Sequence, residues 1–169
     1  KIETFQKWRD RAPNGFRYIL KYSRYGTHIK RLKDPADHIG TFLDHAEHLK
    51  SFLGPVLVQI PPNWKVMPDR LDAFLAAAPK RRRWAVEIRD PSWFTEQILG
   101  ILEKHNAALC LHDMIPDHPD RHTADWVYLR YHGPHRDYTG KYPPRAIAAI
   151  ARKIDDCQRG GMDVFCFFN

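Results

Sequence analysis

The sequence predicts an α/β fold, and within that class a TIM (β/α)8 barrel that is incomplete in this chain. Three observations lead to this prediction. Strand-like and helix-like segments alternate, polar side chains stand at the C-terminal end of every predicted strand, and the chain opens on a helical segment and stops inside its last strand. Alternating strands and helices form parallel sheets with right-handed crossovers, as in open doubly wound sheets and closed barrels.

Size and composition fit one domain, residues 1–169. The 169 residues are 43% hydrophobic and 28% charged, which is ordinary for a globular domain with a core. Apolar runs fall short of the roughly 20 residues of a membrane helix, and "KIETFQKWRD" lacks the apolar core of a signal peptide. We therefore expect a cytoplasmic protein with no membrane partner. Its three cysteines, without C-x-x-C spacing, are expected to be reduced thiols.

Six short segments are predicted to be strands because they are rich in β-branched, aromatic or leucine side chains and most are bounded by turn residues. They span residues 16–22, 55–61, 84–90, 108–114, 126–133 and 163–169.

Helical periodicity links most of these strands. The segment 34–54 carries apolar side chains at helical spacing and is predicted to close on Gly54, and three later segments repeat the pattern at 67–79, 94–106 and 143–161. A further helical segment, 3–13, opens the chain. The connection 115–125 has two prolines and no apolar period, so it is predicted to be a loop.

Polar residues at the strand ends favour the barrel over an open sheet. They are Lys21, Gln59, Glu87 with Arg89, His112 with Asp113, Arg130 with His132, and Asn169. In a barrel these ends form one rim around a single site, whereas an open sheet would string them along an edge. A complete barrel takes about 250 residues. We therefore expect part of the barrel to be missing at both ends of this chain.

Several segments, in this order and at these spacings, resemble a known family. They are "FRYILKYSRYGTHIKRL", "GPVLVQIPP", "WAVEIRDPSWF", "VYLRYHG" and "DVFCFFN". Together they are similar to the YecE-like family of uncharacterised proteins (domain of unknown function seventy-two). The resemblance implies a TIM barrel of which this chain holds strands three to eight, without the first two strands and the closing helix. It implies no reaction.

The stretch "WAVEIRDPSWF" places two charged residues at the end of a strand. Val86 and Ile88 suit the face toward the helices, so Glu87 and Arg89 should point into the barrel near its C-terminal rim. Two interpretations remain open: an internal ion pair that fills the barrel top, or part of a functional site. Burial offsets much of an ion pair's attraction, so stability alone explains such a pair poorly.

The predicted rim is cationic and suits an anion. Lys21, Arg89 and Arg130 can recognise phosphate or carboxylate groups, and Gln59 and Asn169 lie at the same depth. Glu87 among these cations should stay ionised, as a general base would, and His132 is the better proton donor. We thus predict Glu87 and His132 as catalytic residues. The predicted ligand-binding residues are Lys21, His28, Gln59, Arg89, Trp93, Arg130 and Asn169.

Aromatic and metal-binding alternatives stay open. Trp93, and His28 after the first predicted strand, could contact a base or sugar, while an aromatic there could equally plug the barrel top. The cofactor is unknown and no metal ligand is assigned. If a divalent metal binds, its best ligands are Glu87, His112, Asp113 and His132.

Two functions are compatible with this rim. One is an enzyme, predicted to be a hydrolase, that acts on a small phosphorylated ligand, a nucleotide or nucleic acid; the other is a binding module for an anionic ligand or protein partner. The charge of +7 supports either. The "KRRR" run, 80–83, precedes a strand and should lie at the opposite face. The sequence does not determine the oligomeric state.

Overall fold

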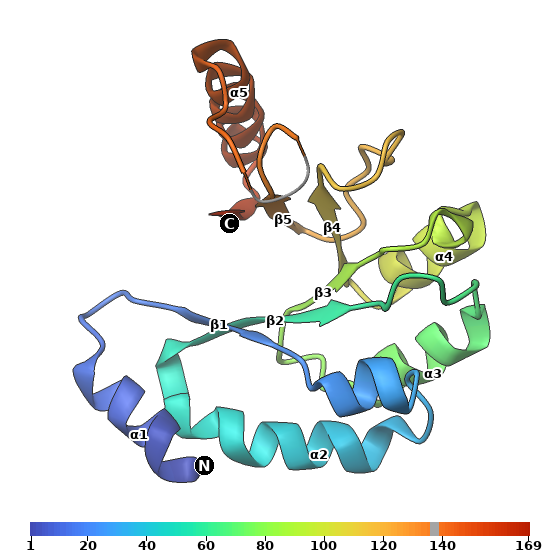
Figure 1. Cartoon of the computed structure of the whole chain (residues 1–169). Helices are drawn as coiled ribbons and strands as arrows, with labels where there is room; N and C mark the ends of the chain where they lie inside the picture. The colour runs from blue at the N-terminus through green and yellow to red at the C-terminus, as the bar shows by residue number, and fades with distance from the viewer. Residues whose placement is uncertain (136–138) are drawn as a thin grey trace.

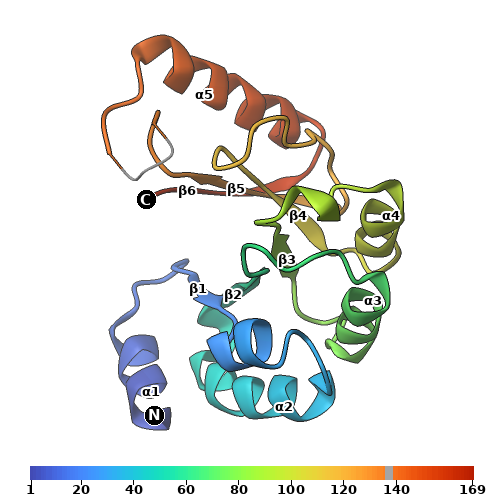
Figure 2. The same cartoon turned by 45° about the vertical axis from the view of Figure 1, so that its right-hand side comes forward.

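In the computed structural model of the chain, the structure describes residues 1–135 and 139–169, and these contain one six-stranded sheet. Each strand pairs in parallel with the next in chain order. The sheet curls into half a barrel (Figures 1 and 2), so the predicted incomplete TIM-like barrel is confirmed. The strands are β1 (Tyr18–Lys21), β2 (Leu53–Gln59), β3 (Trp84–Glu87), β4 (Ala108–His112), β5 (Trp126–Tyr131) and β6 (Asp163–Phe168).

Helices cover the outer, convex side of the curled sheet, as Figure 2 shows for α2 to α5. The described helices are α1 (Ile2–Arg11), α2 (Pro35–Ala46), α3 (Pro68–Ala77), α4 (Glu96–Lys104) and α5 (Pro144–Arg159). Three short helical turns join them: η1 (Tyr25–Ile29), η2 (Glu47–Phe52) and η3 (Pro91–Trp93). The 115–125 connection is a loop, as predicted.

Local sequence signals set where these helices begin. Pro35, Pro68 and Pro144 each stand in the first turn, where the fixed φ of proline suits a helix and its missing N–H is not needed. Helix α4 begins after Thr95, whose hydroxyl accepts a hydrogen bond from the backbone N–H of Ile98 at 3.2 Å.

Alternation along the strands sorts apolar side chains into two cores. Val86 and Ile88 join the large core between sheet and helices, as predicted. Ala85 and Tyr128 join a smaller core on the inner face of the sheet. Side chains that continue the inner alternation past the C-terminal ends of the strands therefore meet at the barrel mouth.

Most predicted boundaries differ from the observed ones by a few residues, and two of the differences have a clear local cause. The third strand ends at Glu87, not Asp90, because the chain turns into η3 at Pro91, with Asp90 accepting from the N–H of Ser92 at 3.0 Å. Gly54 does not close a helix; it lies within β2. A Cβ there would lie 2.7 Å from Cδ1 of Ile19 and 3.2 Å from the carbonyl oxygen of Tyr18, so β1 can approach only because the residue is glycine.

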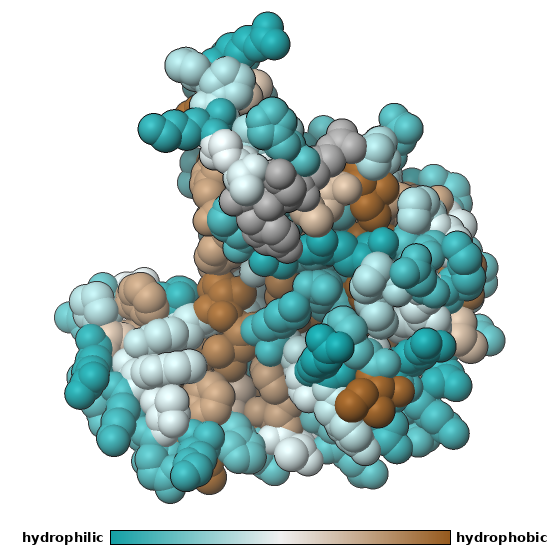
Figure 3. Space-filling view, in the orientation of Figure 1, coloured by the Kyte–Doolittle hydropathy of each residue, from teal (hydrophilic) through white to brown (hydrophobic). Residues whose placement is uncertain are grey.

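The surface in the view of Figure 3 is mostly hydrophilic or mixed, apart from an apolar strip near its middle. Among the helices that the structure describes, none combines the length and apolar character that crossing a membrane requires.

The close approach at Gly54 leads to a stability prediction. Gly54→Ala should lower the free energy of unfolding by about 1–3 kcal/mol, since the added methyl group overpacks the contact with β1. Gly40→Ala is the matched control: Gly40 lies in α2, and among the described residues nothing outside the helix backbone comes within 4 Å of where a Cβ would stand. Alanine there should stabilise by about 0.5–1 kcal/mol. Urea unfolding of both variants measures the difference, and equal effects would contradict the packing argument.

Candidate functional site

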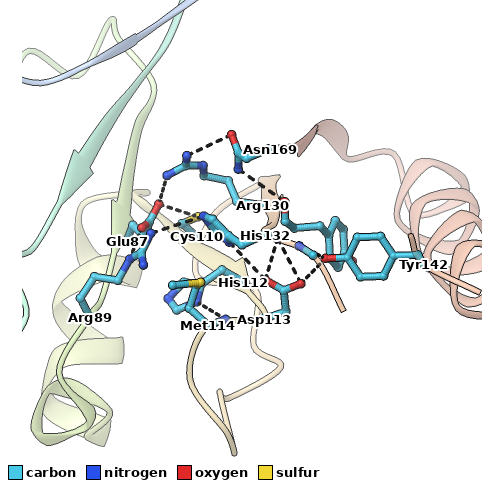
Figure 4. A network of polar contacts seen from close by, with 12 residues as sticks. Glu87, Arg89, Cys110, His112, Asp113, Met114, Arg130, His132, Tyr142 and Asn169 are labelled. Carbon is cyan, nitrogen blue, oxygen red and sulfur yellow. Dashed lines mark hydrogen bonds and ion pairs between the residues drawn. The ribbon is translucent and has the colours of Figure 1, made fainter. Parts of the chain in front are cut away.

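A buried carboxylate lies at the centre of the barrel mouth. The side chain of Glu87, the last residue of β3, has no exposed surface. One carboxylate oxygen accepts from Nε of Arg89 and the other from Nη1 of Arg130 on β5 (Figure 4). Burial alone would raise the pKa of Glu87, but the two guanidinium groups outweigh it and hold the pKa below its usual value. Glu87 is therefore ionised, with both oxygens engaged.

Arg130 links this carboxylate to a small cavity on the inner face of the sheet. Its Nη2 donates to Oδ1 of Asn169 at 3.2 Å. On the neighbouring strands β1 and β2, Nζ of Lys21 donates to Oε1 of Gln59 at 2.7 Å. Lys21, Arg130 and Asn169 line one cavity of about 180 Å³, whose remaining walls include Tyr128. The cavity therefore has a cationic rim and a partly apolar wall.

An aspartate and a histidine form a second group beside the buried carboxylate. His132 is fully buried, and its Nδ1 lies 3.1 Å from Oδ1 of Asp113. Asp113 also accepts from the N–H of His132 at 2.9 Å and from the hydroxyl of Tyr142. On the other side of the ring, Nε2 lies 3.4 Å from Nη2 of Arg89, which can only donate.

These partners determine the protonation of His132. Because Nδ1 donates to a carboxylate and Nε2 accepts from a guanidinium, the ring is neutral. Burial lowers its pKa, the bond to Asp113 opposes this, and Arg130 and Arg89 lower it further. A neutral ring with its proton on Nδ1 directed to Asp113 and its Nε2 lone pair engaged by Arg89 has no proton directed at a ligand, so the arrangement does not favour the proton-donor role expected from the sequence.

The neighbouring His112 is held neutral as well. Its Nε2 donates to the carbonyl of Ile88 at 2.7 Å, and its Nδ1 accepts from the N–H of Met114 at 3.2 Å. Burial, with a contribution from His118, lowers its pKa to about 4. A proton on Nδ1 would remove the acceptor for Met114, so the folded mouth excludes the charged form.

The structure brings together most, but not all, of the predicted site. Seven of the predicted side chains lie at the mouth through the contacts above: Lys21, Gln59, Glu87, Arg89, Arg130, His132 and Asn169. His28 and Trp93 are not among the residues that line the cavity. Trp93 is fully buried in the large core between sheet and helices, where it donates to the carbonyl of Trp64 and packs against its ring.

Tyr142 is the mouth residue that the sequence did not reveal. It comes from the connection before α5, where no periodic pattern marks a contact, and its hydroxyl accepts from the N–H of Gly133 at 2.7 Å. The four metal ligands considered from the sequence do not form a metal site here: within residues 1–135 and 139–169, no three His, Cys, Asp or Glu side chains are grouped so that they could hold an ion.

Comparison with known proteins identifies the family. All of the chain, residues 1–169, matches the family described as "Protein of unknown function DUF72". The chain belongs to the DUF72 family. This confirms the YecE-like resemblance, which is the same family. No curated protein matches this DUF72 chain.

Two solved structures of DUF72 family proteins share the fold. One, from Thermotoga maritima, is 23% identical with a TM-score of 0.85 over 100% of this chain and 72% of its own. Another, from Enterococcus faecalis, is 20% identical with a TM-score of 0.82 over 99% of this chain and 76% of its own. At these identities, the similarity concerns the fold of this DUF72 chain alone.

The buried ion pairs of Glu87 should contribute more to the free energy of unfolding than a similar set of exposed ion pairs. Glu87→Gln should lower the free energy of unfolding by about 3 kcal/mol, because two largely buried guanidinium groups lose their carboxylate. Glu47→Gln is the matched control: Glu47 also forms ion pairs with two arginines, Arg81 and Arg82, but its side chain is 37% exposed, so the cost should stay within about 1 kcal/mol. Urea unfolding measures both, and similar costs would contradict the assignment.

The lowered pKa of His112 should make the stability of the fold depend on pH. Between pH 6.5 and about 4 the unfolded chain protonates His112 and the folded DUF72 chain does not, so the unfolded state binds more protons and stability falls as the pH falls. At 1.36 kcal/mol for each pKa unit, this amounts to about 3 kcal/mol over the window. Urea unfolding at several pH values should show a shallower decline for His112→Gln; parallel curves would contradict it.

Proposed function

We propose that the barrel mouth of this DUF72 protein binds a small phosphate-bearing ligand, with the phosphate between Lys21 and Arg130. The observation that carries the proposal is that these two cations, from β1 and β5, line one cavity of about 180 Å³. Charged donors arranged around a concave site are what phosphate recognition requires.

Donor groups and charge at the mouth support this assignment. In the described contacts, Lys21 uses one of its three donors on Gln59, and Arg130 uses two of its five on Glu87 and Asn169. The three mouth cations, Lys21, Arg89 and Arg130, outnumber the two carboxylates there, Glu87 and Asp113, and Arg89 and Arg130 share the oxygens of Glu87. Both observations favour an anion over a neutral ligand.

The wall of the cavity suggests what accompanies the phosphate. Tyr128, Leu57 and Phe167 line it below the charged rim. An aromatic and aliphatic wall suits a planar, partly apolar group such as a nucleobase. A nucleoside monophosphate is therefore the proposed ligand class, and a nucleic acid end with the same chemistry would fit the same rim.

A second candidate function is hydrolysis of the bound ligand, and the Asp113–His132 pair favours it. Asp113 orients the ring through Nδ1, and Nε2 would accept a proton from water once the Arg89 guanidinium, 3.4 Å away, turned from it toward the ligand. Glu87 then acts as a positioning residue, because both of its oxygens are engaged. Since the charged side chains pair largely with one another, binding is better supported than turnover.

Lys21 offers a clean test of binding because it is exposed. In an amide NMR titration of the ¹⁵N-labelled protein with AMP, Gln59 and Asn169 should shift saturably in the wild type. Lys21→Gln should weaken this binding about tenfold, the effect of losing one charge-assisted hydrogen bond. Arg145→Gln, an exposed cation on α5, is the charge-matched control and should bind as the wild type does.

The outcomes separate the two functions. Equal affinity in Lys21→Gln and Arg145→Gln, or shifts confined to other parts of the chain, would overturn binding at the mouth. If phosphate is released from AMP, His132→Asn should abolish the release while leaving the affinity within about twofold of the wild type. Release that survives this substitution would overturn the hydrolase role of His132.

A further inference from the structure

A second cationic cavity lies at the opposite end of the strands from the mouth. Arg83 directly precedes β3 and pairs at 2.6 Å with Asp163, the first residue of β6, which places the run at the N-terminal face as predicted. Arg17, Arg81, Arg82 and Arg83 line one cavity of about 200 Å³, together with Phe165. This cavity shares no lining residue with the mouth.

The charge around this cavity is not balanced. Among the described ion pairs, Glu47 pairs with both Arg81 and Arg82, and Asp163 pairs with Arg83. Arg17 donates only to the carbonyl of Phe16 in the described contacts. Four guanidinium groups therefore face two carboxylates, which leaves about two positive charges. A phosphate monoester carries between about 1.5 and 2 negative charges at neutral pH, so it matches this excess.

Hydrogen bonding around the cavity is also incomplete. Nε of Arg82 is buried and has no hydrogen-bond partner among the residues that the structure describes. Buried polar groups almost always have a partner, so the hydrogen bonding of Arg82 is incomplete, and a phosphate in the cavity would be bound by the terminal Nη groups of the arginines.

The existing ion pairs would not prevent an anion from entering. The side chains of Glu47 and Asp163 are 37% and 65% exposed, and the Arg82 contact with Glu47 is long, at 3.5 Å. Exposed pairs of this kind are weak and screened by water, so a phosphate can compete for the same guanidinium groups. The buried Glu87 pairs at the mouth lack this freedom.

We propose that this N-terminal cavity, defined by Arg17, Arg81, Arg82 and Arg83, is a second anion site that binds the phosphate group of a small phosphorylated ligand. Its described lining offers four guanidinium groups, whose excess charge matches one phosphate group, and a single aromatic side chain, Phe165. An adjoining cavity on the same face shares Arg81, Arg82 and Arg83 and adds Lys80 and Lys104, with Asp125 as the one carboxylate on its described lining, so the choice of a discrete phosphate rests on the charge match of about two.

The test uses the full chain with Lys21→Gln, so that the site proposed at the mouth is weakened. Inorganic phosphate is titrated at constant ionic strength and the amide shifts of Arg83 and Phe165 are followed. These should saturate, and adding Arg82→Gln with Arg83→Gln should weaken binding about tenfold or more. Arg145→Gln should leave it unchanged. Failure here leaves the proposed function at the mouth intact, because the two sites are followed through different residues.

A gain-of-binding variant keeps the test decisive if the arginine variants fold poorly. Glu47→Gln removes the carboxylate that competes for Arg81 and Arg82, so phosphate should bind several-fold more tightly. A merely structural role for the arginines predicts no gain. Shifts that do not saturate, or unchanged affinity in Glu47→Gln, would overturn the proposal. Tighter binding of an unphosphorylated single-stranded oligonucleotide than of phosphate would overturn the choice of ligand.

Discussion

Burial of one carboxylate determines how the barrel mouth is arranged. Glu87 sits at the end of β3 with no exposed surface, and an ionised group in that position requires partners. Arg89 and Arg130 supply them, and each then directs a further contact: Arg89 faces Nε2 of His132, and Arg130 reaches Asn169. The guanidinium groups are thus fixed by the carboxylate before any ligand arrives. A preorganised cation binds an anion with little loss of side-chain entropy. The ion pairs of Glu87 with Arg89 and Arg130 therefore favour ligand binding, even though they leave Glu87 without a free oxygen for catalysis.

The curl of the sheet gives this carboxylate its neighbours. Parallel register sets Gln59 beside Glu87 and His112 beside Arg130, so inward side chains from adjacent strands stand at one depth. Curvature then brings Lys21 on the first strand into the same cavity as Arg130 on the fifth. In a flat sheet these two residues would be separated by the width of the intervening strands, since neighbouring strands lie about 4.8 Å apart. The cationic cavity is therefore a property of the curved sheet and not of any single motif.

The sequence predicted what depends on strand periodicity and missed what depends on irregular segments. Successive side chains of a strand point to opposite faces, so side-chain direction follows from residue number alone. This period of two placed Lys21, Gln59, Glu87 and Arg130 on one rim correctly. Gly54 was misread because the same residue ends helices and permits close strand contacts, and only the position of Ile19 distinguishes the two. Tyr142 has no periodic signal, since its contact with Asp113 depends on the path of the connection before α5. The burial of Trp93 likewise depends on Trp64, which is distant in sequence.

A glutamate paired with two arginines occurs at both ends of the strands, and the two groups differ in how far water reaches them. Glu87 and Glu47 each form ion pairs with two guanidinium groups, but the side chain of the first is fully buried and that of the second is 37% exposed. At the mouth, water cannot replace a lost partner, so the network holds its geometry and any anion must use the donors that remain on Lys21 and Arg130. At the N-terminal face, water screens the pairs and stabilises each partner when it separates, so Arg81 and Arg82 can exchange a carboxylate for a phosphate. A rigid site and an exchangeable site on one small barrel thus follow from how deeply each carboxylate is buried.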